Sequence, residues 1–299
     1  MGKIAFVFSG QGDQYSGMGK ELAEKYIAAT QVFAKCDEKR PGTSTQCFEG
    51  TTEELMETRN TQPCMFAMEM AAYAVLMEKG IAPEVVAGFS LGEVVAATAA
   101  GVFDLETGFE VVCKRGELMQ AAAEKADTAM MAVVKLAAKQ VEEICAKHEQ
   151  VYPVNYNCPG QITVSGLQAS MEAFSAEVKD AGGRALPLKV KGAFHSPFMR
   201  ETARDFAKVL EQAEVKKPVC TLYSNLTAKP YTEDVIATLS EQICSPVRWE
   251  AIIRNMIEAG VDTFIEIGPG RTLSNMIKKI DASVSAQTFT EYLAEVEAC

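Results

Sequence analysis

The sequence predicts an α/β protein whose parallel sheet is covered by helices and interrupted by a smaller inserted unit. Short apolar runs of strand character alternate with helix-length segments over residues 1–126 and again over residues 192–299. Between residues 127 and 191 the order becomes strand, helix, strand, strand, helix, strand. We therefore expect a large subdomain of residues 1–126 and 192–299 and a small subdomain of residues 127–191.

Hydrophobic runs and capping residues predict the elements of the large subdomain. A strand over residues 3–9 leads into Gly10-Gln11-Gly12. Thr61 is a candidate cap for a helix from about Pro63 to Lys79, because proline suits the first turn of a helix. The other predicted elements are a helix around 18–38, a strand at 84–87, helices at 93–100 and from about 105 to 125, a helix from 197 to about 213, a strand at 220–224, a helix around 249–259, a strand at 263–267 and a helix after Gly270.

The small subdomain follows the βαββαβ order of a ferredoxin-like split motif. Its second and third strands are paired through the Cys158-Pro159-Gly160 turn. The six predicted elements are a strand at 129–136, a helix at 138–148, strands at 151–157 and 161–166, a helix at 170–181 and a strand at 184–190. We expect this unit to be a compact insertion in the large subdomain.

Composition narrows the class of protein. The chain has 299 residues, 48% hydrophobic and 23% charged, which is ordinary for a soluble globular protein. Its longest apolar stretches, near 67–77 and 94–103, are too short to span a membrane, and the N-terminus shows no export signal. Nine cysteines without a C-x-x-C pair indicate reduced thiols in the cytoplasm. The net charge of −11 argues against a nucleic-acid partner, and an anionic substrate would need a local cationic site.

Gly88-Phe89-Ser90-Leu91-Gly92 is typical of a nucleophile elbow. It lies between a predicted strand and a predicted helix, where a sharp turn needs small residues and lifts the serine hydroxyl toward a substrate. The alternative is a glycine-rich turn that carries a solvated serine. The flanking elements favour the catalytic interpretation of Ser90.

A serine nucleophile needs an adjacent base, and the chain has only two histidines. His148 lies near the end of a predicted amphipathic helix, so we expect it on the surface. His195 precedes Ser196-Pro197, which suit the cap and the first residue of a helix. The partial positive charge of that helix N-terminus should keep the imidazole neutral. The alternative is a packing histidine at a domain junction.

Backbone donors and a cation complete the candidate site. Gly10-Gln11-Gly12 is a weak dinucleotide fingerprint because Tyr15 replaces the third glycine, so it is better interpreted as a turn that aims an N–H at the site. The second oxyanion donor usually follows the nucleophile, here Leu91. On spacing alone, Arg115 would be interpreted as a surface arginine. The two distant histidines and dispersed cysteines predict no metal site.

Five motifs occur in order along the chain. They are Phe8-Ser9-Gly10-Gln11-Gly12, Gly88-Phe89-Ser90-Leu91-Gly92-Glu93, Asn155-Tyr156-Asn157-Cys158-Pro159-Gly160-Gln161, Gly192-Ala193-Phe194-His195-Ser196-Pro197 and Gly268-Pro269-Gly270. The whole chain therefore resembles the malonyl-CoA:acyl carrier protein transacylases, which also occur as acyltransferase domains of polyketide and fatty acid synthases. The resemblance implies a hydrolase-like large subdomain, a ferredoxin-like insertion and a site in the cleft between them.

The resemblance also implies roles for the matching residues. Ser90 would be the nucleophile and His195 its base, with the carbonyl of Gln242 orienting the imidazole in place of an aspartate. The backbone of Gln11 and that of Leu91 would bind the oxyanion.

Two matching side chains concern the substrate. Arg115 would pair with the free malonyl carboxylate through two parallel charge-assisted bonds, which an acetyl group cannot make. Phe194 matches the aromatic residue of malonyl-selective members, and its bulk would crowd an α-methyl group. Leu91 is also compatible with malonyl use.

The sequence departs from the family at two positions. Histidine usually stands where Phe89 is, and proline where Ser9 is. Any polar role of that histidine is therefore absent, which bears on rate and on substrate preference. The nucleophile, base, arginine and glutamine remain, so we expect an active enzyme.

The resemblance predicts a ping-pong acyltransferase that moves malonate from malonyl-CoA to acyl carrier protein for fatty acid synthesis, with no cofactor. A polyketide pathway, a serine hydrolase and a catalytically inactive scaffold are the alternatives. Because acyl carrier proteins are acidic, we expect a basic docking patch of Lys189, Lys191 and Arg200, with Lys278 and Lys279 as further candidates.

Overall fold

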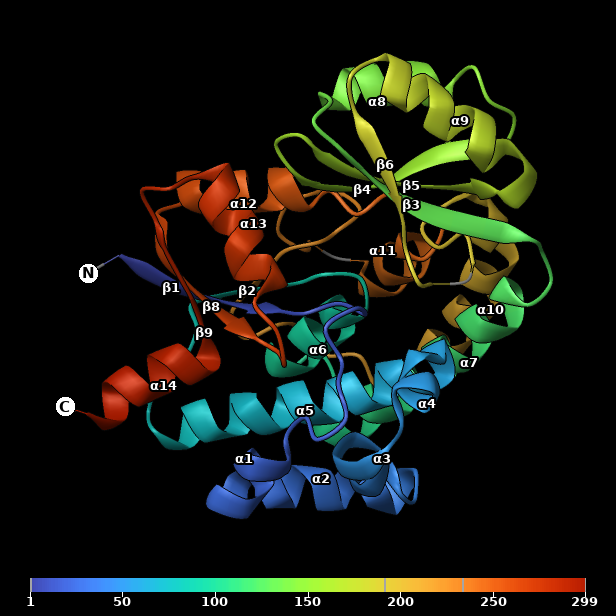
Figure 1. Ribbon diagram of the computed structural model, residues 1–299. Coiled ribbons are helices and arrows are strands. Elements are labelled where there is room, and N and C mark those ends of the chain that lie inside the picture. The colour runs from blue at the N-terminus through green and yellow to red at the C-terminus, as the bar shows by residue number, and fades with distance from the viewer. Residues whose placement is uncertain (1, 191, 233, 299) are drawn as a thin grey trace.

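The computed structural model describes residues 2–190, 192–232 and 234–298. It contains two separate sheets, as Figure 1 shows. The larger sheet has five strands, all parallel, and the smaller has four strands in antiparallel pairs. The predicted α/β class, with a parallel sheet covered by helices and a second small sheet, is confirmed.

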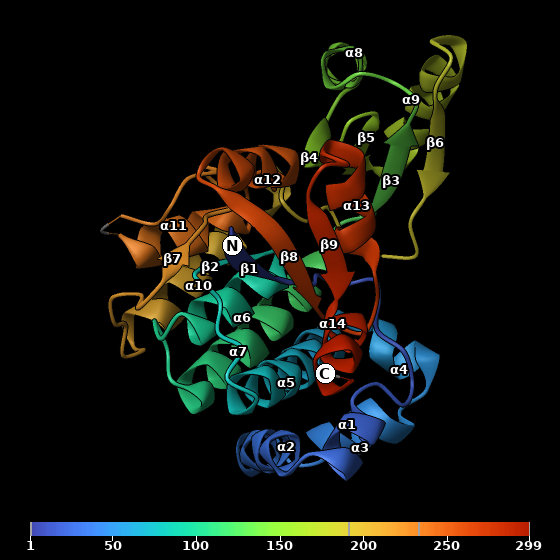
Figure 2. The same ribbon diagram turned by 90° about the vertical axis from the view of Figure 1, so that its left-hand side faces the viewer.

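The parallel sheet runs in the order β7-β2-β1-β8-β9. Its strands are β1 (Lys3–Phe8), β2 (Val85–Gly88), β7 (Thr221–Leu222), β8 (Val261–Ile267) and β9 (Ser285–Thr288). Helices lie on both faces of this sheet, with α12 and α13 above it and α5 and α6 below it in Figure 1. Figure 2 gives the same arrangement from the side.

Residues of β1 alternate between the two halves of the core. Phe6 and Phe8 pack in the cluster that includes α5, α6 and α7, whereas Ala5 and Val7 pack in the cluster that includes α12 and α13. All four side chains are fully buried. A strand covered on both faces is expected to be apolar throughout, which is why residues 4–8 form a continuous apolar run.

The helices of the large part precede and follow the small sheet. They are α1 (Lys20–Lys25), α2 (Ile27–Lys39), α3 (Thr43–Glu49), α4 (Thr52–Met56), α5 (Thr58–Glu78), α6 (Leu91–Ala99), α7 (Leu105–Ala123), the 3₁₀ turn η1 (Pro197–Met199), α10 (Arg200–Glu211), α11 (Val235–Gln242), α12 (Trp249–Glu258), α13 (Thr272–Ile280) and α14 (Phe289–Glu297). No helix in the described ranges is both long and apolar enough to cross a membrane.

The small sheet lies between residues 128 and 187 and has the order β4-β5-β3-β6. This is the strand order of a ferredoxin-like fold, as the βαββαβ pattern predicted. Helices α8 and α9 cover the face that is turned away from the large sheet in Figure 1. The elements are β3 (Thr128–Val134), α8 (Ala138–Cys145), β4 (Val151–Cys158), β5 (Gln161–Leu167), α9 (Gln168–Asp180) and β6 (Arg184–Pro187).

One predicted helix is broken in two, and the predicted start of another is wrong. The helix expected at 18–38 is broken at Tyr26, whose backbone is extended, so α1 and α2 are separate. Thr61 does not cap a helix, because α5 already begins at Thr58 and the Thr61 hydroxyl donates back to the Glu57 carbonyl. Pro63 therefore lies inside α5 rather than in its first turn.

Several short elements are absent from the sequence prediction. These are α3, α4, α11, β9 and α14. The strand predicted at 220–224 pairs with β2 only through Thr221 and Leu222, and the strand predicted at 184–190 ends at Pro187. Short segments carry too few residues for a clear period, so tertiary packing decides their conformation.

Candidate active site

Ser90 occupies a strained turn between β2 and α6. Its backbone has φ 57° and ψ −105°, a region that side-chain-bearing residues rarely adopt. A Cβ on Gly88 would lie 1.8 Å from the Gly92 carbonyl oxygen, and a Cβ on Gly92 would lie 2.3 Å from that of Phe8. The two glycines are therefore required for α6 to start so close to β1 and β2, which is the geometry of a nucleophile elbow.

His195 contacts the Ser90 hydroxyl across 105 residues of sequence. The distance from Ser90 Oγ to His195 Nε2 is 2.7 Å, and His195 Nδ1 lies 2.9 Å from the backbone oxygen of Gln242. Because that oxygen can only accept, Nδ1 carries the proton and Nε2 is free to accept from the serine. Ser196 caps η1, with Pro197 as its first residue, as the sequence predicted.

The imidazole is buried and its basicity is low. Burial, followed by the positive charge of Arg115, lowers the pKa of His195 from 6.5 to about 4. The neutral ring agrees with the prediction, but its main cause is burial rather than the helix terminus that the sequence suggested. His148 lies elsewhere, at the surface and partly exposed, where it packs against Phe174 and is bonded to Glu177.

Arg115 is completely buried beside the serine. Its Nη2 donates to Ser90 Oγ at 3.2 Å and to Gln242 Oε1 at 2.8 Å, while its Nη1 donates to Gln62 Oε1 at 2.8 Å. Burial lowers the pKa of Arg115 to about 10, so it remains charged at neutral pH. The surface position that spacing suggested is wrong, and the place implied by the family resemblance agrees with this geometry.

The two proposed oxyanion donors are available. Among the described residues, neither the Gln11 N–H nor the Leu91 N–H has a hydrogen-bond acceptor, and Leu91 opens α6. The Gln11 side chain donates to Thr58 Oγ1 at 3.3 Å, which ties its loop to the start of α5. Two N–H groups without an internal acceptor are what a tetrahedral oxyanion requires.

Asn225 is a site residue that the sequence analysis missed. Its Oδ1 accepts from the Ser90 N–H at 2.8 Å, and its Nδ2 donates to the Gly88 carbonyl at 2.6 Å, so it braces both sides of the elbow. Asn225 follows β7, at the carboxyl end of a parallel strand, where functional residues of α/β sheets gather. That position was the only signal available in the sequence.

The two departures from the family have structural partners. The Phe89 ring packs edge-on against Trp249, with centroids 5.6 Å apart. The Ser9 hydroxyl donates to Glu266 at 3.3 Å, and Glu266 also accepts from the first amides of α13. Nearby Glu69 is fully buried, and burial followed by the charge of Glu266 raises its pKa well above the usual range. Ser9 thus belongs to a buried polar cluster next to the Gly10-Gln11-Gly12 turn.

Comparisons with known proteins agree with this geometry. The acyl transferase domain family matches residues 5–292. The chain belongs to the acyl transferase family. It is 41% identical to a malonyl CoA-acyl carrier protein transacylase of Bacillus subtilis (strain 168) over 289 residues, which cover 94% of this chain and 91% of that protein.

Solved structures of this family share the whole fold. The transacylase of Clostridium perfringens is 34% identical, with a TM-score of 0.95 over 99% of this chain and 98% of that one. A malonyl-transacylase solved in complex with a type II PKS acyl-carrier protein is also 34% identical, with a TM-score of 0.95 over 99% and 100% of the two chains.

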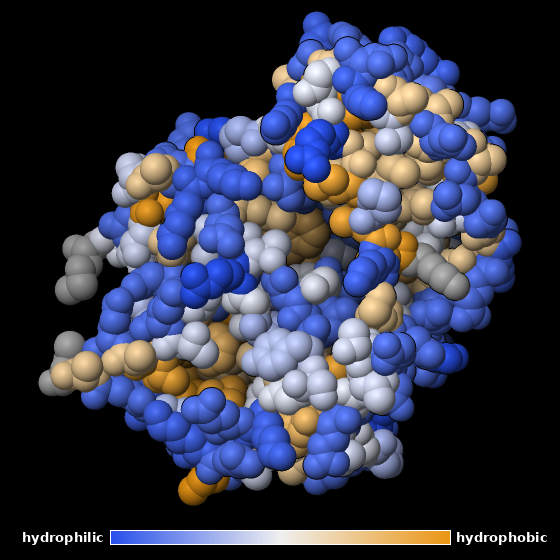
Figure 3. Space-filling view, viewed as in Figure 1, coloured by the Kyte–Doolittle hydropathy of each residue, from blue (hydrophilic) through white to orange (hydrophobic). Residues whose placement is uncertain are grey.

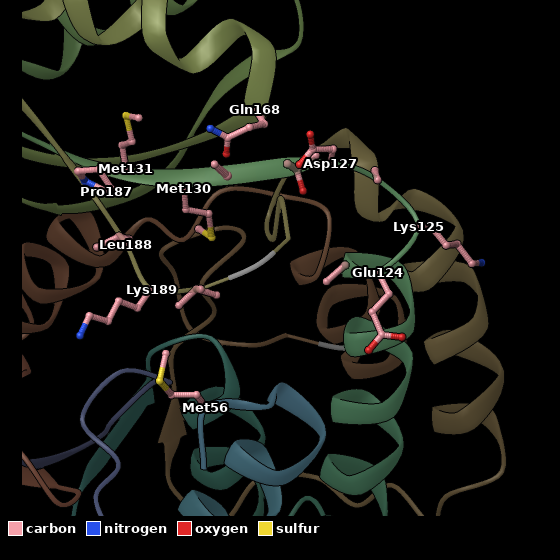
Figure 4. Close-up of a pocket in the computed structure, with 15 residues that line it drawn as sticks. Met56, Glu124, Lys125, Asp127, Met130, Met131, Gln168, Pro187, Leu188 and Lys189 are labelled. Atoms are coloured by element: carbon pink, nitrogen blue, oxygen red, sulfur yellow. The ribbon is translucent and has the colours of Figure 1, made fainter. Parts of the chain in front are cut away.

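A pocket of about 760 Å³ lies between the small sheet and the large part of this acyl transferase family member. Figure 3 shows the hollow from outside, with apolar side chains around it. In Figure 4, Met130 and Leu188 lie on the side of the small sheet and Met56 lies across the pocket on α4. Its lining includes Lys189 but neither Ser90 nor His195.

Phe194, one residue before the histidine, is buried.

The low pKa of His195 predicts an unusual pH profile. A base of pKa about 4 stays neutral, so labelling of Ser90 by an organophosphonate should keep nearly all of its plateau rate at pH 5.5. With an ordinary histidine pKa of about 6.5, the rate would fall to about a tenth. Labelling rates followed by intact mass from pH 5 to 8 check this, and a midpoint near 6.5 would contradict it.

Proposed function

We propose that this protein transfers a malonyl group from malonyl-CoA to the phosphopantetheine thiol of acyl carrier protein, through a malonyl ester of Ser90. The observation that carries the proposal is the buried, charged Arg115 within hydrogen-bond distance of Ser90 Oγ. In a malonyl-serine, the carboxylate carbon is three bonds from Oγ, which places it within reach of the Arg115 guanidinium. The names of the relatives point to the same reaction.

The first half of the reaction acylates the enzyme. Ser90 Oγ attacks the thioester carbon while its proton passes to His195 Nε2, and the N–H groups of Gln11 and Leu91 stabilise the oxyanion. The carbon–sulfur bond then breaks, and the CoA thiolate takes the proton from His195. Gln242 accepts from Nδ1 and stabilises the imidazolium during the step.

The second half reverses these roles with a new thiol. The pantetheine thiol gives its proton to His195 and attacks the ester carbon, and the Ser90–acyl bond breaks as Ser90 regains the proton. The malonyl carboxylate remains in the Arg115 fork throughout. Across the two halves one proton leaves with CoA and one enters with the pantetheine thiol, and His195 carries both, so the proposal needs no cofactor.

Incubation with malonyl-CoA alone tests the proposal. The wild-type protein should release CoA once and hold a malonyl adduct on Ser90, because water is a poor substitute for the thiol. Intact-protein mass spectrometry checks this, with Ser90→Ala as the control that should carry no adduct. Steady release of malonate would identify a serine hydrolase instead, and an unlabelled wild type would identify an inactive scaffold.

Arg115→Ala should remove the preference for malonyl over acetyl. Charge-assisted hydrogen bonds contribute about 1.5–3 kcal/mol, so the ratio of the two acylation rates should fall about 10- to 100-fold. Rates of CoA release from malonyl-CoA and acetyl-CoA measure this ratio. The exposed Arg254, which pairs with Glu250 on α12, offers Arg254→Ala as a matched control that keeps the ratio. If the ratio is unchanged in Arg115→Ala, Arg115 does not bind the malonyl carboxylate.

We further propose a cytoplasmic role in fatty acid synthesis, with a polyketide pathway as the second candidate. A relative solved with a type II PKS acyl-carrier protein keeps the second candidate open. The proposed subdomain boundaries are 1–126 with 192–299, and 127–191. The small sheet, which spans residues 128–187, falls inside the second range.

For the carrier protein we propose docking at the pocket between the two sheets. Lys189 is exposed and lines this pocket, and Arg200 is exposed at the start of α10. Lys191 lies outside the described residues. Lys278 and Lys279 lie on α13, which is well apart from α10 in both Figure 1 and Figure 2, so they are weaker candidates for the same patch.

Charge reversal at Lys189 tests this docking surface. Lys189→Glu should raise the Michaelis constant for an acidic carrier protein several-fold while the acylation by malonyl-CoA is kept, because the charge acts on encounter with the carrier. Lys278→Glu is the matched reversal away from the pocket. If both variants change the Michaelis constant equally, or if neither changes it, the carrier protein does not dock at this pocket.

A further inference from the structure

Glu93 is a buried carboxylate directly beneath the elbow that the proposed reaction does not use. It is fully buried and accepts three hydrogen bonds, two from the loop between β7 and α11 and one from the end of α11. Its Oε1 accepts from the Asn225 N–H at 3.1 Å and the Tyr231 hydroxyl at 2.5 Å, and its Oε2 accepts from Gln242 Nε2 at 2.8 Å. All three partners are donors, which favours the ionised form of the carboxylate, whereas burial acts against it and raises the pKa of Glu93 to about 7.

This arrangement fixes which way the Gln242 amide points. Its Nε2 donates to Glu93 Oε2 and also to the Ser90 carbonyl, at 2.7 Å. The opposite end, Oε1, is therefore turned to accept from Arg115 Nη2. A flipped amide would set two donors against each other at Arg115 and two acceptors against each other at Glu93.

The same arrangement explains how a buried guanidinium is held by neutral groups rather than by a carboxylate. Among the described residues, no carboxylate lies within 4 Å of a nitrogen of Arg115. Its neighbours are the neutral amides of Gln62 and Gln242, and its Nε is unpartnered. A directly bonded carboxylate would compete with an acyl carboxylate, whereas a charge placed behind Gln242 supports Arg115 without occupying it.

We infer that Glu93 is a positioning residue for substrate selectivity, which acts through the Gln242 amide to hold the Arg115 guanidinium in place for an acyl group that carries a carboxylate. The inference rests on the proposed malonyl transfer. It assigns Gln242 two separate roles, since its backbone oxygen orients His195 and its side chain couples Glu93 to Arg115.

The test is the rate of Ser90 acylation from malonyl-CoA and from acetyl-CoA. In Glu93→Gln, the new amide cannot accept from all three donors, so Gln242 loses its fixed orientation. The malonyl rate should fall at least tenfold while the acetyl rate changes by less than threefold. Tyr231→Phe is the matched control, because it removes one donor from the same carboxylate but leaves the bond to Gln242. Its selectivity ratio should stay within threefold of wild type.

A double-mutant cycle separates selectivity from general damage. In the Arg115→Ala background, Glu93→Gln should change the malonyl-to-acetyl ratio no further, since both substitutions act on the same interaction. If Glu93→Gln does not fold, Gln242→Leu should show the same loss of ratio, because it keeps the backbone oxygen and removes the coupling.

Three outcomes would overturn the inference. These are an unchanged ratio in Glu93→Gln, an equal fall of both acylation rates, or additive losses in the cycle. A wild-type protein that takes up no malonate would instead refute the proposed function, and this inference with it. A wild type that is malonylated and a Glu93→Gln variant with an unaltered ratio would refute the inference alone.

Discussion

One glutamine, Gln242, bonds four of the polar residues in and beneath the candidate site. Its backbone oxygen lies 2.9 Å from the His195 ring, and its side chain bonds the Ser90 carbonyl, Arg115 and Glu93. Residues that are distant in sequence are thereby held around one buried amide, which is 1% exposed. Water cannot replace a lost partner at this depth, so a change in one of these bonds would leave a buried polar group unpaired and disturb the others.

The parallel sheet brings these groups together at one edge. Ser9 and Gln11 follow β1, Ser90 follows β2, and Asn225 follows β7. Carboxyl ends of parallel strands point the same way, so loops far apart in sequence converge there. The contact between Ser90 and His195 adds the segment that leaves the small sheet, and this segment is anchored where the His195 N–H donates to the Ile243 carbonyl.

Local signals in the sequence identify the parts of the site that depend on local geometry. The elbow glycines and the cap after His195 are short motifs whose conformation follows from nearby residues, and both form as predicted. Arg115 shows the limit of such signals, because its burial depends on Gln62 and Gln242, which lie 53 and 127 residues away. Asn225 and Glu93 were missed for the same reason. In the fold, the long apolar elements were predictable, whereas Tyr26 and Pro63 show that helix ends depend on tertiary contacts.

The charge on Arg115 makes the imidazole of His195 respond to what the guanidinium holds. This cation is the second cause, after burial, of the low pKa of His195. An anionic acyl group seated against it would cancel part of that field, so the ring would gain proton affinity once the serine is esterified. The same histidine would then be a stronger base for an incoming thiol than it is at rest. The bound acyl carboxylate would thus raise the basicity of His195 between the two half-reactions.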